Sequence, residues 1–455
     1  MRGRLAVWAG KATGALSRAS GRGGGTTLPG DVARAVDPAV LQRLAGELTG
    51  GAVLVAGTNG KTTTSRLVTR LLEGIPSHVV ANRSGSNLIT GVTAAAVAGA
   101  RLDGHLRADW AVFEVDEASL PAAVAETRPR AVLVGNLFRD QLDRYGELET
   151  TALIIQRALA ALPEQARTVL NADDPRVGEI GLGLPREPIW YGIDDAQVSA
   201  ARLPHAADAT TCPRCGSTLV FDAVYVGHDG AYRCPAGDFQ RPALEVAATD
   251  VCLRGLDSLS LRAAGTRLEL PLGGLYNAYN VLGAFSLGLA LGLDAGYMAA
   301  RLAGAEAAFG RLERIDAAGR RLTLLLAKNP AGFNEALRGS IELAGGRHFL
   351  IALNDRIADG RDVSWIWDVD FELLAGRARS VTVAGTRADD LAVRLKYAGV
   401  DGATVPQPDF ERALDGFLGG LPEAAEGYVL CTYTAMLDLR RVLAQRGWAR
   451  PYWAT

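Results

Sequence analysis

The first part of the chain alternates short apolar runs with longer amphipathic stretches. The apolar runs have the length of buried strands, and they lie at 52–56, 110–113, 131–134 and 168–170. The stretch 62–72, which follows the first run, has the spacing of a helix. Buried strands that alternate with helices are typical of a parallel sheet covered by helices on both faces. The pattern therefore predicts an α/β domain whose functional loops follow the carboxyl ends of its strands.

A second α/β unit follows an interruption of this pattern. Residues 205–245 are rich in Pro, Gly, Cys and aromatic residues, which favours a small inserted module. The pattern then returns with an apolar helix at 278–293, and further strands are predicted at 322–326, 349–353 and 380–384. The two units divide near Gly310-Arg311. We therefore predict an N-terminal helical segment (1–48), a central domain that carries the insertion (49–310) and a C-terminal domain (311–455).

Composition and charge narrow the classes of function. The chain has 48% hydrophobic and 22% charged residues, the balance of a globular protein. Its net charge of −2 argues against a domain built to bind nucleic acid, so no nucleic-acid partner is expected. Five unevenly placed cysteines are too few for a disulfide scaffold, which favours a reducing cytoplasm.

Membrane contact is expected to be peripheral at most. No apolar run approaches the roughly 20 residues that cross a bilayer. The basic stretch 1–30 lacks the contiguous apolar core of a secretory signal. An ordinary N-terminal helix is its simpler interpretation, and a basic amphipathic helix lying on a membrane surface is the alternative.

The clearest motif is a glycine-rich loop between the first predicted strand and the helix after it. It consists of Gly57, Thr58, Asn59, Gly60, Lys61, Thr62 and Thr63. Glycines let the backbone approach phosphates, and the N–H groups at a helix N-terminus point at the anion. Lys61, one of only four lysines, would reach the β- and γ-phosphates of ATP, and Thr62 would offer its hydroxyl to Mg²⁺. The motif predicts a protein that uses ATP and Mg²⁺.

Polar clusters also follow the other three predicted strands of the first unit. Glu114, Asp116 and Glu117 follow the second strand, residues 136–147 the third and residues 171–175 the fourth. Because the carboxyl ends of parallel strands meet at one edge of the sheet, we expect these clusters to outline one active-site rim. Glu114 would hold the metal there, although a solvated turn explains each acid equally well.

These residues resemble the Mur ligase family, the ATP-dependent amide-bond synthetases of peptidoglycan synthesis that are related to folylpolyglutamate synthase. The loop 57–63 matches the family's phosphate loop. Glu114 stands at the position of a Mg²⁺ ligand, and residues 171–175 match an Asn-x-Asp-Asp segment. Residues 277–280 match the family's adenine-contacting segment, with Tyr276 in place of a histidine.

A linker at 309–313 completes the match, because the family's linker arginine reaches the nucleotide phosphates. The resemblance thus implies that Asn280 and Arg311 also bind ATP. It implies a Mur-ligase-like central ATPase domain with an inserted Cys-rich ribbon, followed by a C-terminal Rossmann-like domain.

Three further segments, at 136–147, 326–334 and 359–368, resemble the MurT subfamily, the ligase subunits of lipid II isoglutaminyl synthases. This resemblance implies ATP-dependent amidation of the α-carboxylate of D-glutamate in lipid II to D-isoglutamine through an acyl phosphate. It also implies a heterodimer with a GatD-like glutaminase that supplies ammonia, in the cytoplasm at the inner face of the cell membrane. Two alternatives stay open: a self-sufficient amino-acid ligase of the folylpolyglutamate type, and a non-catalytic scaffold that activates a glutaminase.

The chain itself carries no recognisable glutaminase motif. A glutaminase needs a nucleophilic cysteine beside a histidine base. Cys252 and Cys431 lie in strand-like runs and are expected in the core, and none of the five histidines lies in a pairing motif. The MurT resemblance implies that Asp362 completes the partner's catalytic triad by orienting its histidine. A helix or turn cap is the alternative role, and Asp359 and Asp368 are less favoured stand-ins.

Two features depart from the family patterns. Gln141 replaces the histidine of ordinary Mur ligases, and residues 145–165 lack their carbamylated lysine, which leaves a second Mg²⁺ site open. Cys212, Cys215 and Cys234 match three ligands of a four-cysteine zinc ribbon, and the fourth cysteine is missing. Asp238, His228 or water would complete a Zn²⁺ site, and a metal-free remnant is the alternative.

Overall fold

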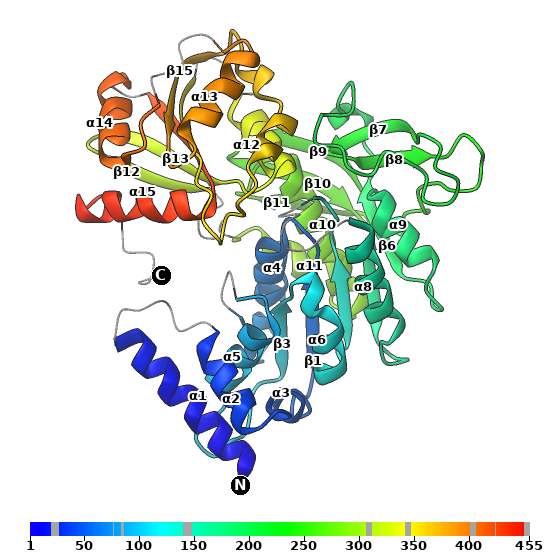
Figure 1. Cartoon of the computed structure of the whole chain (residues 1–455). Coiled ribbons are helices and arrows are strands. Elements are labelled where there is room, and N and C mark those ends of the chain that lie inside the picture. The colour runs from blue at the N-terminus through cyan, green and yellow to red at the C-terminus, as the bar shows by residue number, and fades with distance from the viewer. Residues whose placement is uncertain are drawn as a thin grey trace.

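The computed structural model shows a large sheet with helices on both faces and a smaller α/β unit beside one end of it (Figure 1). It describes residues 1–19, 27–75, 77–82, 86–139, 148–305, 312–341, 347–400, 406–423 and 425–449. The predicted α/β class is confirmed. Among the described helices, none combines the length and the apolar character that crossing a bilayer requires.

The large sheet has nine strands in the order β11-β10-β9-β6-β5-β4-β1-β3-β2. Its strands are β1 (Gly51–Ala56), β2 (Val79–Ala81), β3 (Trp110–Glu114), β4 (Ala131–Val134), β5 (Arg167–Asn171), β6 (Ile189–Ile193), β9 (Val246–Arg254), β10 (Ser258–Ala263) and β11 (Thr266–Leu270). All neighbours from β2 to β9 pair in parallel. The four strands predicted for this unit are therefore confirmed.

An antiparallel edge of β9, β10 and β11 goes beyond the sequence prediction. Exposed and buried residues alternate along β11, so one of its faces packs on the core and the other faces solvent. Gly265 turns the chain between β10 and β11 with a φ of +75°, a conformation that favours glycine. This alternation distinguishes a half-buried hairpin from the buried parallel strands.

The strand β1 shows why helices cover both faces of the sheet. Leu54 joins one core and Val53 and Val55 the other, since successive side chains of a strand point to opposite faces. The first core is covered by α1 (Arg2–Ala19), α2 (Leu28–Val36), α3 (Val40–Ala45), α5 (Ile89–Gly99), α6 (Leu120–Thr127), α8 (Leu148–Ala160) and α9 (Pro175–Leu182). The second is covered by α4 (Lys61–Glu73), α10 (Leu275–Ala290) and α11 (Ala295–Leu302).

The C-terminal unit has its own five-stranded sheet in the order β12-β13-β16-β14-β15. Its strands are β12 (Glu313–Ala317), β13 (Arg320–Leu326), β14 (Arg347–Ala352), β15 (Ala378–Ala384) and β16 (Glu426–Cys431). The helices α12 (Pro330–Ile341) and α13 (Ala388–Tyr397) pack on one face, and α14 (Phe410–Gly420) and α15 (Tyr433–Gln445) on the other. The boundary expected near residues 310–311 lies outside the described residues, so the domain limits stay a prediction.

The Cys-rich insertion forms a hairpin that leaves the large sheet after β6 and returns to it at β9. Its two strands, β7 (Val220–Val226) and β8 (Asp229–Arg233), pair antiparallel as a separate small sheet. Figure 1 shows this hairpin at the side of the molecule, level with the C-terminal unit.

Candidate active site

The phosphate loop lies between the end of β1 and the start of α4, where two glycines leave room for close neighbours. A Cβ atom at Gly60 would lie 2.0 Å from Oδ1 of Asn280 on α10, and one at Gly57 would lie 3.0 Å from the backbone of Asn136. Both glycines have a positive φ, +123° at Gly57 and +83° at Gly60. The backbone thus makes a tight turn directly before the N-terminus of α4. The N-terminus is the end of a helix that attracts anions.

Lys61 begins α4 and is almost fully buried, with 7% of its surface exposed. Its ammonium donates to Oε1 of Glu117 at 2.8 Å. Burial alone would lower the pKa of Lys61, but the neighbouring carboxylates, first among them Glu117, raise it above its usual value. Burial alone would raise the pKa of Glu117, but Lys61 lowers it. The two groups therefore form a buried ion pair in which both are charged.

Three buried acids surround this single lysine. Glu114 ends β3, and Asp116 and Glu117 follow it. The hydroxyl of Thr62 donates to Oε2 of Glu114 at 2.8 Å. Hydroxyl and carboxylate oxygens are ligands that Mg²⁺ binds, and a bound cation would balance the excess negative charge of the three acids. The oxygens of Thr62 and Glu114 therefore fit a Mg²⁺ site.

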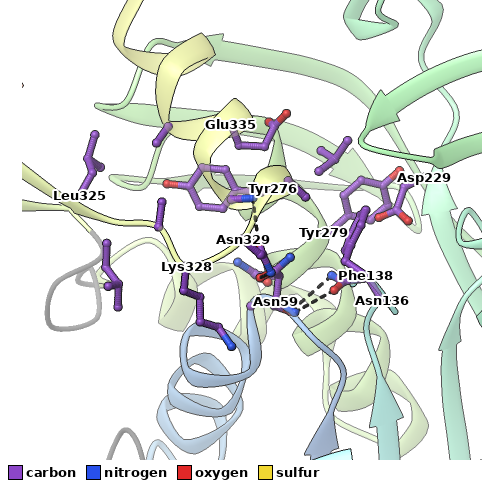
Figure 2. Close-up of a pocket in the computed structure, with 18 residues that line it drawn as sticks. Asn59, Asn136, Phe138, Asp229, Tyr276, Tyr279, Leu325, Lys328, Asn329 and Glu335 are labelled. Atoms are coloured by element: carbon purple, nitrogen blue, oxygen red, sulfur yellow. Dashed lines mark hydrogen bonds between the residues drawn. The ribbon is translucent and has the colours of Figure 1, made fainter. Parts of the chain in front are cut away.

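A pocket that opens to solvent lies next to the loop (Figure 2). Its walls come from the loop, from α10 and from the connection between β13 and α12, so it lies between the two units. The polar and aromatic residues in its lining are Asn59, Asn136, Phe138, Asp229, Tyr276, Tyr279, Asn280, Lys328, Asn329 and Glu335. In Figure 2, Lys328 extends toward the helix below the loop. Aromatic faces with a few convergent amides suit a nucleotide base.

Asparagine side chains tie the loop to both units. The backbone N–H of Asn59 donates to Oδ1 of Asn136 at 2.8 Å. Nδ2 of Asn329, just before α12, donates to Oδ1 of Asn59 at 3.0 Å (Figure 2). On the other side, the hydroxyl of Thr64 donates to Oδ1 of Asn280 at 3.2 Å. These bonds fix the loop against the end of β4, against α10 and against the C-terminal unit.

A buried polar network lies behind the pocket, and its central acid, Asp173, belongs to the cluster at 171–175 that the sequence singles out. The hydroxyl of Tyr279 donates to Oδ2 of Asp173 at 2.6 Å, and Arg241 lies 3.1 Å from Oδ1 of the same carboxyl. Burial raises the pKa of Asp173 to about 6, although Arg241 opposes it. Asp229 of β8 lines the pocket, and burial raises its pKa well above the usual range. The insertion therefore contributes to this pocket, which its cysteine pattern does not indicate.

Asp362 is exposed in the C-terminal unit, before the short helix η3 (Ser364–Asp368). Its Oδ1 accepts the backbone N–H of Ser364 at 2.8 Å, and this bond lowers the pKa of Asp362. The residue lines a surface hollow together with Trp367 and Asp389. The turn-capping bond is therefore present, and the charged carboxylate lies at the protein surface.

The two alternatives to Asp362, which are Asp359 and Asp368, form contacts within the chain. Asp359 is 3% exposed and accepts the backbone N–H of Thr434 at 2.8 Å. Asp368 lies 3.0 Å from Nη2 of Arg139. Asp362 is therefore the most exposed of the three.

The cysteines outside the insertion do not form a glutaminase site. Cys431 is buried as expected, and burial raises the pKa of its thiol. The expectation for Cys252 is wrong, because it lies exposed on β9, where alternate side chains face solvent. In the part of the chain that the structure describes, no cysteine sulfur is hydrogen-bonded to a histidine.

Comparisons with family models and with known proteins point to the same family. The model of the Mur ligase middle domain matches residues 55–215, and that of the MurT ligase C-terminal region matches residues 326–436. The chain is 33% identical, over 91% of its own length and 92% of the relative's, to the lipid II isoglutaminyl synthase (glutamine-hydrolyzing) subunit MurT of Staphylococcus aureus (strain N315). It is 34% identical, over 93% of each chain, to the subunit of the same name from Streptococcus pneumoniae. The chain belongs to the MurT family of Mur ligases.

The fold agrees with this family. The pseudomurein peptide ligase type C from Methanothermus fervidus superimposes with a TM-score of 0.67 at 20% identity, over 87% of this chain and 79% of that one. The Mur-ligase-like fold expected from the sequence is therefore confirmed. As a MurT family member, the chain is an ATP-dependent carbon–nitrogen ligase of peptidoglycan synthesis, and its Mur ligase relatives imply the use of ATP and Mg²⁺.

Some expected site residues lie outside the described part of the chain. Arg311 is one of them, and the segment 140–147 with Gln141 is another. Their roles therefore stay predictions. Of the remaining expected residues, the structure brings together the loop 57–63, Glu114 and Asn280.

The cysteine module of this MurT family member places four donor side chains together. Cys212, Cys215, Cys234 and Asp238 have their sulfur and carboxylate atoms within 4.8 Å of one another. His228 is not available to this group, because its Nδ1 accepts backbone N–H groups and its Nε2 lies 3.3 Å from Asp174. The carboxylate of Asp238 thus stands where the missing fourth ligand is needed. Three sulfurs and one carboxylate form a donor set that Zn²⁺ accepts.

We expect the purified protein to contain about one zinc ion per chain at this module. Cys215→Ser and Asp238→Ala should lose the metal and lower the midpoint of thermal unfolding, because the module has a small apolar core. Elemental analysis and thermal melts measure both effects. The matched control Cys252→Ser changes an exposed cysteine outside the module and should keep the zinc. A wild-type protein without zinc would make the module a metal-free remnant.

Proposed function

We propose that this chain is the synthetase subunit that amidates the α-carboxylate of D-glutamate in lipid II, with ammonia supplied by a GatD-like glutaminase subunit. One observation carries the proposal: the chain has a phosphate loop whose lysine and threonine contact buried acids, but its described residues contain no hydrogen-bonded cysteine–histidine pair. The names of the relatives, which are subunits of a glutamine-hydrolyzing synthase acting on lipid II, support it.

The chemistry requires ATP because a carboxylate is a poor acceptor for ammonia. In the proposed reaction, a carboxylate oxygen attacks the γ-phosphorus and ADP leaves, which gives an acyl phosphate. Ammonia then attacks the acyl carbon, phosphate leaves, and a proton of the attacking nitrogen is released. Negative charge grows on the phosphoryl oxygens in the first step, so fixed positive charge at the loop lowers its barrier.

The loop residues have separate proposed roles. Lys61, held charged by Glu117, would turn its ammonium to the phosphates, and Arg311 would reach them from the linker. Thr62 and Glu114 would hold Mg²⁺, which when bound neutralises phosphate charge. Tyr276 and Asn280 would flank the base in the pocket between the two units.

Amidation of lipid II by the purified chain with ATP and Mg²⁺ tests this function. Ammonium at high pH alone should yield product, because free ammonia then reaches the acyl phosphate without a glutaminase. Glutamine should yield product only when a co-purified glutaminase is added. Product is measured as the change from carboxylate to carboxamide by mass spectrometry.

Other outcomes identify the alternatives. Product with a free amino acid in place of ammonia would favour a self-sufficient ligase of the folylpolyglutamate type. ATP hydrolysis without lipid II product under every condition would exclude lipid II as the acceptor. Stimulation of the glutaminase without any need for ATP would favour the scaffold.

A further inference from the structure

The N-terminal helix α1 is packed firmly against the body of the protein along one face. That buried face consists of Ala6, Val7, Gly10 and Gly14. A Cβ atom at Gly10 would lie 2.8 Å from Val97 on α5 and 2.9 Å from the carbonyl oxygen of Pro29 on α2. Figure 1 shows α1 along the outer edge of the molecule, beside α2 and α5. Its orientation is therefore fixed by close packing.

The opposite face of α1 is apolar and exposed to solvent. It consists of Leu5, Trp8, Ala12, Ala15 and Leu16, which we call the outer face of α1. Leu5, Trp8 and Leu16 are 46%, 43% and 71% exposed. At about 100° per residue, the five positions fall within an arc of about 100° opposite the buried face. Leu102, which is 66% exposed, extends this surface, since Nε1 of Trp8 donates to its carbonyl oxygen at 2.7 Å.

Basic residues border the outer face, and α1 contains no acidic residue. Its charged residues are Arg2, Arg4, Lys11 and Arg18. On the same helical projection, Arg4, Lys11 and Arg18 follow one border of the apolar strip and Arg2 lies at the other. The guanidinium of Arg4 lies 4.7 Å from the ring centre of Trp8, so the positive charge sits directly beside the aromatic ring.

We propose that the outer face of α1 is a docking surface for an anionic lipid bilayer. An apolar strip with a basic border and a tryptophan is the chemistry of a helix that lies in the membrane interface. A second copy of this chain is a poorer occupant, because a symmetric contact of two such helices would bring basic borders together. This inference goes beyond the proposed reaction. The two are related only because a lipid-linked substrate would lie in the same bilayer.

Vesicle sedimentation of the full-length chain tests this surface. Vesicles with phosphatidylglycerol should bind the wild type at least 10-fold more strongly than pure phosphatidylcholine vesicles, and salt should weaken the binding. The double variant Trp8→Glu/Leu16→Glu should bind at least 10-fold more weakly, as should Arg4→Glu/Arg18→Glu. Ile357→Glu changes a residue of the C-terminal unit that is 79% exposed, and it should bind like the wild type.

Three results would overturn the proposal. The first is binding that does not differ between the two vesicle types. The second is binding that persists in both double variants when circular dichroism shows them folded. The third is a lipid-free dimer that dissociates in the Trp8→Glu/Leu16→Glu variant, because the face would then belong to a second copy. The assay uses neither ATP nor lipid II, so a failure of the amidation reaction would not affect its result.

Discussion

Replacement of Lys61 by alanine should lower ammonium-dependent amidation by about 10²–10³-fold in kcat, the usual cost of removing one group that stabilises transition-state charge. The ammonium of Lys61 is the cation at the start of α4, and three buried acids already surround it. Without this ammonium, the negative charge that develops on the γ-phosphoryl group would lie near those acids with one less cation to stabilise it. The rate with ammonium is the proper readout, because it does not depend on the glutaminase.

The ion pair with Glu117 requires a second variant. Lys61→Ala leaves Glu117 buried without its cation, which typically costs about 3–5 kcal/mol of stability. Lys61→Arg keeps a positive charge beside Glu117, but a planar guanidinium does not replace a compact ammonium at a phosphate. We therefore expect Lys61→Arg to be folded and at least about 10-fold slower.

A matched control separates this site from a general loss of charge. Lys396 is an exposed lysine on α13, and Lys396→Ala should keep the wild-type rate and melting temperature. Thermal melts of all three variants show which of them are folded. A folded Lys61→Ala variant with the wild-type amidation rate would mean that ATP does not react at this loop.

The strands of the parallel sheet could be predicted from the sequence because burial on both faces makes them continuously apolar. Val53 and Leu54 serve opposite cores, so neither side of β1 tolerates a polar residue. The limits of α10 were harder to predict, since the apolar pattern continues past its end. The helix runs from Leu275 to Ala290, and Gly292 follows with a φ of +83°, where a helix does not continue.

The parts of the site that the sequence does not reveal are contacts between distant segments. Asn329 meets Asn59 across the two units, and Asp229 reaches the pocket from the insertion. Neither contact has a local signature, because each depends on how separate elements pack. The fourth donor at the cysteine module is similar: Asp238 fits there by its position in the folded hairpin, and spacing alone does not distinguish it from His228.

Asp362→Asn should lower glutamine-dependent amidation by about 10²–10⁴-fold and leave ammonium-dependent amidation unchanged. In the proposed heterodimer, the carboxylate of Asp362 orients the partner's histidine and stabilises its charged form. Asparagine removes that charge. Its side-chain oxygen can still accept the backbone N–H of Ser364, so the turn before η3 is expected to keep its shape. The two amidation rates are measured with the same reconstituted complex.

The comparison of the two nitrogen sources distinguishes a role in the partner's chemistry from a role in this chain's own fold. A fall in both rates would mean that Asp362 supports the synthetase unit itself. A fall in neither would mean that the partner completes its triad without this residue. Asp389→Asn is the matched control, because Asp389 is exposed in the same hollow, and both of its rates should stay at the wild-type level. Gel filtration of the Asp362→Asn complex is also needed, since a partner that no longer binds would lose glutamine-dependent activity without any change in the triad. Only an intact complex with the selective loss assigns the carboxylate to glutamine hydrolysis.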